Sequence, residues 1–99
     1  MLADRASLEE VKARIVELIS LDPNLKGEIG DLLKSMDQAI DTVSTVDAKQ
    51  AVGSVKRALV KMEGAINKAD DLTGKTGKVL SSIKSILTTL EAFKDYWPS

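Results

Sequence analysis

Apolar residues recur three or four positions apart in four separate segments of this 99-residue chain. This spacing places them on one side of a helix, and it predicts helices over about 8–20, 23–42, 47–69 and 78–96. Short connections make consecutive helices antiparallel neighbours. The sequence therefore predicts a single all-α domain over residues 1–99, a compact antiparallel four-helix bundle with a shorter first helix.

The residues that repeat at this spacing are the predicted core. They are Leu8, Val11, Ile15, Leu18 and Ile19; Leu25, Ile29, Leu32, Leu33, Met36, Ile40 and Val43; Val52, Val55, Leu59, Met62, Ile66 and Ala69; and Val79, Leu80, Ile83, Ile86, Leu87, Leu90, Phe93 and Trp97.

Several local signals set the predicted helix ends. Ser7 and Glu10 have the spacing of a capping box at the start of the first helix. Asp22 and Pro23 separate the first two helices, since Asp is a good N-cap and Pro fits the first helical position. The segment 70–78 contains two glycines and no apolar periodicity, which indicates a loop.

Gly53 and Gly64 lie eleven residues apart, close to three helical turns, so they share a face of the third helix. Glycine at such a position favours a close approach of a second helix. We expect that face to pack against a neighbour.

The residue types exclude most catalytic sites. The chain has no cysteine and no histidine, which removes thiolate chemistry, the Ser-His-Asp triad and the commonest metal ligand. The acids Glu9, Glu10, Glu17, Glu28, Asp31, Asp37 and Asp41 fall between the apolar positions and are expected on a solvated face. We expect no enzyme activity, no cofactor and no metal.

One segment has a weak likeness to a phosphate-binding loop. Residues 69–76 match its relaxed pattern with Ala69 in the place of the first glycine. A helix precedes the segment where a strand is needed, and Asp70 and Asp71 would repel a phosphate. The sequence therefore predicts a loop there and no nucleotide site.

No long apolar run occurs at the N-terminus, and no uncharged run approaches the length of a membrane span. We expect a cytoplasmic protein.

The charges divide unequally along the chain. Residues 1–47 hold ten acids and five bases, and residues 48–99 hold five acids and nine bases, which gives net charges of −5 and +4. Three interpretations are open: pairing between neighbouring helices, head-to-tail association between copies, or nucleic-acid or lipid binding by the third helix. The overall charge of −1 and the lack of interleaved aromatic residues do not favour nucleic acid.

The last helix carries few charges, and Lys84 is the only one between Val79 and Leu90. It is either sheltered inside the bundle or faces a partner or a lipid surface. Phe93, Tyr96 and Trp97 share one side of its end, where they either close the bundle or form a binding anchor.

Residues 14–33, RIVELISLDPNLKGEIGDLL, combine a short helix, an Asp-Pro boundary and a Leu-rich helix. This pattern resembles helical effector-associated and adaptor-like domains of bacterial signalling and conflict proteins. The resemblance covers about a fifth of the chain. It implies a non-enzymatic module that recruits partners through helix faces, and it assigns no functional residues.

We therefore expect a protein–protein interaction module, an adaptor or assembly subunit that binds another protein or itself through charged helix faces. The alternative is a membrane-perturbing bundle whose last helix contacts lipid. The residues predicted to make the contact are Lys56, Arg57, Lys61, Asp37, Asp41, Phe93, Tyr96 and Trp97.

Overall fold

The computed structural model describes residues 4–43, 46–68 and 74–93, and all of its regular elements there are helical. They are α1 (Arg5–Leu21), the short 3₁₀ helix η1 (Pro23–Leu25), α2 (Lys26–Asp41), α3 (Val46–Lys68) and α4 (Gly74–Ala92). The all-α fold predicted from periodicity is confirmed.

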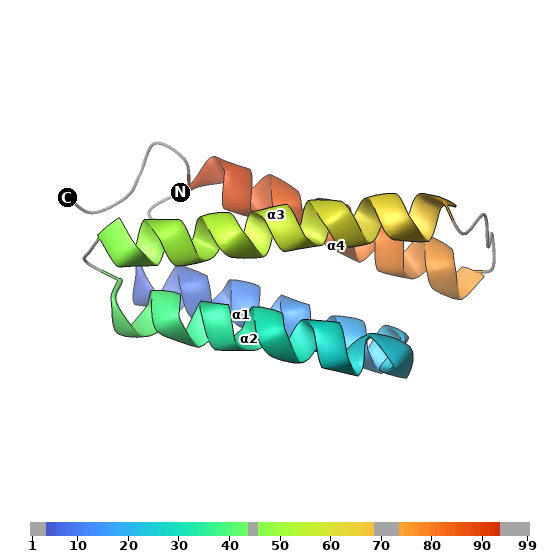
Figure 1. The fold of residues 1–99 in the computed structure, drawn as a ribbon, viewed down its shortest axis with the longest axis horizontal. Coiled ribbons are helices and arrows are strands. Elements are labelled where there is room, and N and C mark those ends of the chain that lie inside the picture. The colour runs from blue at the N-terminus through green and yellow to red at the C-terminus, as the bar shows by residue number, and fades with distance from the viewer. Residues whose placement is uncertain (1–3, 44–45, 69–73, 94–99) are drawn as a thin grey trace.

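The four helices run along the long axis of a bundle of 42 × 22 × 18 Å (Figure 1). Each helix packs against its neighbours in the chain, and α4 also packs against α1, which closes the ring. The pairs α1–α3 and α2–α4 make no such contact and lie on the diagonals. Each helix therefore has one face toward the core, two flanks against neighbours and one outer face.

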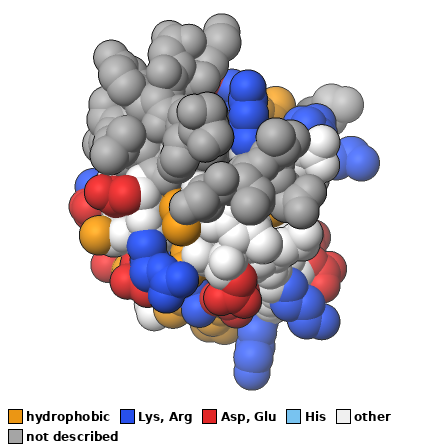
Figure 2. Space-filling view, turned by 90° about the vertical axis from the view of Figure 1, so that its left-hand side faces the viewer, with side chains coloured by type: hydrophobic (Ala, Val, Ile, Leu, Met, Phe, Trp, Pro, Cys, Tyr) orange, Lys and Arg blue, Asp and Glu red, His pale blue; other side chains and the backbone are white. Residues whose placement is uncertain are grey.

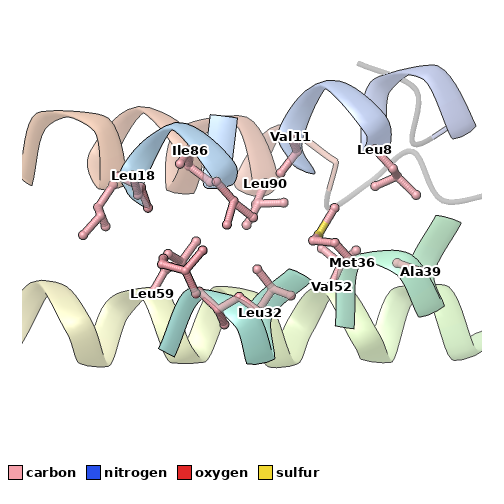
Figure 3. Packing of buried hydrophobic residues seen from close by; sticks show 14 of the residues in the cluster. Leu8, Val11, Leu18, Leu32, Met36, Ala39, Val52, Leu59, Ile86 and Leu90 are labelled. Carbon is pink, nitrogen blue, oxygen red and sulfur yellow. The ribbon is translucent and has the colours of Figure 1, made fainter. Parts of the chain in front are cut away.

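The core is continuous along the bundle and draws on all four helices (Figure 3). No polar or charged residue is buried in the part of the chain that the structure describes. The fully buried side chains include Leu8 and Ile15 of α1, Met36 of α2, Leu59 of α3 and Ile83 of α4. Burial of apolar area is thus the main stabilising contribution to the fold.

Most of the predicted core is confirmed, with additions at small residues. Ala39, Ala48 and Ala51 are also buried, although their side chains are too short to stand out in an apolar pattern. Leu25, Leu33 and several others are only partly buried at the edge of the core.

The predicted start of the first helix was wrong. Asp4, not Ser7, is the N-cap of α1, and its carboxylate accepts a hydrogen bond from the backbone N–H of Ser7 at 2.8 Å. Ser7 therefore lies within the first turn of α1, whereas the predicted capping box placed Ser7 before the first turn. Because α1 begins at Arg5, it has 17 residues and is not shorter than α2, which has 16.

The Asp22-Pro23 boundary is confirmed in detail. Asp22 is extended, its N–H donates to the carbonyl of Leu18, and its carboxylate accepts from the N–H of Asn24 at 3.1 Å. This one residue ends α1 and starts the next turn. That turn is η1 rather than α-helix, so α2 proper begins at Lys26.

The α4 boundaries differ from those predicted. α4 begins at Gly74, four residues before the predicted start, and ends at Ala92, before Tyr96. The start of α4 was not predicted because its first residues carry no apolar periodicity. Gly74, Gly77 and Lys78 are all exposed. The rest of the predicted loop, residues 70–73, lies outside what the structure describes.

The close approach predicted at Gly53 and Gly64 is also wrong. A Cβ at Gly64 would meet nothing within 4 Å, and one at Gly53 would meet only the Arg57 side chain of the same helix, at 3.4 Å. The shared face exists, but it is the outer face of α3 and packs against no other helix.

The Asp4 cap generates a pH-dependent prediction. The hydrogen bond from the Ser7 N–H holds the pKa of Asp4 below its ordinary value of 3.8. Asp4 therefore stabilises the fold fully above pH 3.8, and this contribution is lost as the pH falls through the lowered pKa. We expect Asp4→Ala to lower the urea midpoint at pH 7 and to differ less from the wild type in strong acid.

Ser7→Ala is the matched control for this experiment, because it keeps the backbone N–H that donates to Asp4. We expect it to change the urea midpoint less than Asp4→Ala does. A larger loss in Ser7→Ala would restore Ser7 as the cap.

Candidate interaction surface

The outer face of α3 brings together two of the three predicted basic residues, Arg57 and Lys61. It consists of the positions opposite the core on successive turns: Gln50, Gly53, Arg57, Val60, Lys61 and Gly64. The apolar residues of α3 turn inward, so the outer positions are occupied by cations, small residues and one valine. No acidic side chain is among them.

Arg57 and Lys61 are the charged groups of this face. Both are exposed, and neither is in an ion pair with another side chain that the structure describes. The Arg57 guanidinium lies back along its own helix, beside Gly53, and donates to the Ser54 hydroxyl at 3.2 Å. Because no ion pair with another described side chain must be broken, a partner can contact both charges at little cost in free energy.

Val60 is the most exposed large apolar residue in the described chain, at 52%. It lines a shallow groove between α3 and α4, together with Leu87 and Ala92. Leu59, its neighbour in the sequence, is fully buried. Because successive residues of a helix are turned by about 100°, Val60 points away from the direction of Leu59 and lies outside the core.

Lys56 differs from the other predicted cations. It is half-buried at the edge of the same groove and forms an ion pair with Glu91 of α4. The interpretation that charges pair between neighbouring helices holds for this residue. Lys56 therefore stabilises the α3–α4 contact and is less available to a partner than Arg57 or Lys61.

A second shallow groove borders α3 on its other side, against α2. Its base is apolar, with Leu32, Ala58 and Met62, and its rim carries Glu28 and Asp31 on α2 and Lys61 on α3. No ion pair joins α2 to α3 among the described side chains. The acidic and basic helices are neighbours, yet their charges remain separate along this groove.

The predicted acidic residues do not form one site with the basic ones. Asp37 faces α1, where it pairs with Lys12. Asp41 is exposed at the last position of α2, where the negative end of the helix dipole disfavours a carboxylate. The structure places neither carboxylate on the outer face of α3.

The aromatic residues predicted as anchors also separate. Phe93 is fully buried in the core, so it closes the interior and is not a contact residue of the surface. Tyr96 and Trp97 lie outside the described residues. At the bundle end where α1 begins and α4 ends, acidic and basic side chains are interspersed around the rim (Figure 2).

The core residues of α4 face the inside of the bundle and are not exposed to solvent. Its core positions, including Val79, Ile86 and Leu90, are buried. The hydroxyls of Thr88 and Thr89 donate to carbonyls one turn earlier in the same helix, which satisfies them without charged neighbours. No described helix has both the length and the apolar character to cross a membrane, and lipid contact by the apolar side of α4 would require the bundle to open.

The carboxylates singled out in α1 and α2 are all exposed, as predicted. Among the described residues, no three acids gather closely enough to hold a metal ion. These exposed carboxylates contribute charge to the surface of α1 and α2.

The sequence reasoning missed one feature of the surface. Val16, exposed at 42%, and Val60 are apolar residues that fall off the core pattern. Glu9 and Glu17 were expected on a solvated face and do occupy outer positions of α1, but they were not named as contact residues. The available signal was angular: a valine or an acid roughly opposite a helix's apolar side has to face outward in a closed bundle.

In comparisons with known proteins, no protein-family model, no curated protein and no solved structure matches this chain. The surface therefore has to be interpreted from its own chemistry.

The structure predicts different roles for the adjacent cations Lys56 and Arg57. Lys56→Glu would place a second carboxylate beside Glu91, and we expect the free energy of unfolding to fall by up to about 1 kcal/mol, since the pair is largely exposed. Arg57→Glu should change it by less than about 0.5 kcal/mol. Urea unfolding of both variants measures the difference.

The double variant Lys56→Glu with Glu91→Lys tests the cause, because it reverses the pair and should recover the lost stability. An equal loss in Arg57→Glu would instead assign a structural role to Arg57.

Proposed function

We propose that this chain is a non-enzymatic protein–protein interaction module that binds its partner through the outer face of α3. The observation that carries the proposal is the pair of exposed cations, Arg57 and Lys61, beside the exposed Val60. A face of this kind combines charge that orients a partner with apolar area that a contact can bury.

The small residues of the face favour contact with another helix. A Cβ at Gly64 would meet nothing within 4 Å, and one at Gly53 would meet only the flexible Arg57 side chain, so a partner can approach the backbone of α3 closely at these two positions. The shallow grooves on both sides of α3 can accept side chains that reach past this ridge. A helix or another flat acidic surface of a protein fits these features.

A protein partner is favoured over nucleic acid by the balance of charge. The whole chain carries −1, and exposed acids on α1 and α2 would repel a phosphate backbone. The outer face of α3 has no aromatic side chain on which a base could stack.

The proposal includes an adaptor or assembly role in the cytoplasm, as the resemblance of residues 14–33 to adaptor-like bacterial domains implies. The absence of cysteine is compatible with that compartment. Because the face lies on a helix that the core holds rigidly, it can bind without a change in fold.

Site-specific photo-crosslinking in the cells that naturally make the chain tests this proposal. A benzophenone side chain at Val60 should yield a protein adduct, and the adduct should be lost when Arg57→Glu and Lys61→Glu are added. The same probe at the exposed Gln38 of α2 is the control site.

Absence of any adduct at Val60, or equal adducts at Val60 and Gln38, would contradict the proposal. A nuclease-sensitive adduct would identify nucleic acid as the partner instead.

A further inference from the structure

The outer face of α1 is acidic, although the helix as a whole contains as many bases as acids. Beyond Arg5 at its first position, α1 has two bases, Lys12 and Arg14. Lys12 turns to α2, where it pairs with Asp37, and Arg14 turns to α4, where it donates to the Thr89 hydroxyl at 3.2 Å. Both cations are therefore directed to the flanks of α1.

The positions of α1 opposite the core then carry acids, small residues and one valine. They are Ala6, Glu9, Ala13, Val16, Glu17 and Ser20, and all six are exposed. Glu9 and Glu17 are in no ion pair with another described side chain. Glu10, near the edge of this face, is held by Arg14 at 3.5 Å.

The outer faces of α1 and α3 have the same design with opposite charge. Each has two unpaired charged side chains, small neighbours and one exposed valine. Val16 and Val60 are the large apolar residues that the described chain exposes. Because α1 and α3 lie on a diagonal of the bundle, the acidic and basic faces point away from each other and cannot meet within one molecule.

We propose that the partner of the α3 outer face is a second copy of this chain, which presents the outer face of α1. This inference rests on the proposed function, and it assigns the occupant of the same surface. Glu9 and Glu17 of one copy lie opposite Arg57 and Lys61 of the next, and the two valines are covered in the contact. Small residues on both helices allow the helix axes to approach closely.

α2 is a weaker candidate for the acidic counterpart. Asp37 is held by Lys12, and Glu28 and Asp31 lie beside α3 at the groove that it shares with α2. The exposed side of α2 also carries Lys26 and Lys34, whereas the outer positions of α1 that follow Arg5 carry no base. Only α1 offers an uninterrupted acidic face directed away from α3.

The contact joins two different surfaces, so it is heterologous and leaves one free face at each end of a pair. Copies therefore add head to tail into open chains unless the rotation between them closes a ring. The charges are exposed and the apolar area is small, so the association is expected to be concentration-dependent and sensitive to salt.

Light scattering behind a sizing column, with the full chain in a concentration series, tests the proposal. In about 0.01 M salt, where the Debye length is about 30 Å, the wild-type mass should rise with concentration above the monomer mass of 10.7 kDa. In about 1 M salt, where the Debye length is about 3 Å, it should return toward the monomer.

Two charge-reversed variants make the test specific. Arg57→Glu with Lys61→Glu leaves both faces acidic, and Glu9→Lys with Glu17→Lys leaves both basic, so each variant alone should remain monomeric. Mixed in equal amounts, they present complementary faces again, and the mass should rise. Lys26→Glu with Lys34→Glu on α2 is the matched control for the first variant, and it should associate like the wild type.

Circular dichroism confirms that each variant keeps its helical content, as the substituted side chains are exposed. A wild type that stays monomeric at every concentration in low salt would overturn the inference. So would a mixture that does not associate, because α1 would then not be the counterpart. A foreign protein crosslinked at Val60 would, in either case, leave the proposed function standing.

Discussion

The packing of α4 against α1 is the contact on which the rest of the molecule depends, because it closes the four helices around one core. With the ring closed, every helix has its apolar side inward and two flanks in contact with neighbours. What remains for function is the outer face of each helix. No polar or charged residue is buried among the described residues, so their charged side chains lie on the outer faces and at the edges of the flanks.

Contacts between the flanks of neighbouring helices determine which charged side chains remain on the outer faces. Lys12, Arg14 and Lys56 are all directed to neighbouring helices, where they meet Asp37, Thr89 and Glu91. These contacts hold the flanks together with modest energies, and they also remove three cations from the outer surface. α1 has as many bases as acids within its bounds, yet its outer face is acidic for this reason. α3 remains basic because Arg57 and Lys61 have no such partner. The acidity of the α1 outer face is thus a property of side-chain direction, whereas α3 is already basic by composition.

The sequence predicted the features that depend on periodicity, and it failed where three-dimensional context decides. The residues Leu8, Ile29, Leu59 and Ile83 repeat at helical spacing and are buried. Gly53 and Gly64 do share a face, but only the assembled ring shows that this face is outside. Ser7 and Asp4 are both acceptable N-caps, and the choice between them depends on the backbone geometry. The pairing of Lys56 with Glu91 joins residues 35 positions apart, and no local pattern reports it.

The most direct test of the account is a dilution series of ¹⁵N-labelled chain in low salt, followed by two-dimensional NMR. The complementary-face contact predicts concentration-dependent amide shifts at Ala13 and Val16 on α1 and at Val60 and Gly64 on α3, with α2 and α4 unchanged. Shifts confined to α3 would indicate a symmetric contact between like faces and would contradict the account. So would shifts centred on α2 or α4, or spectra that do not change with concentration.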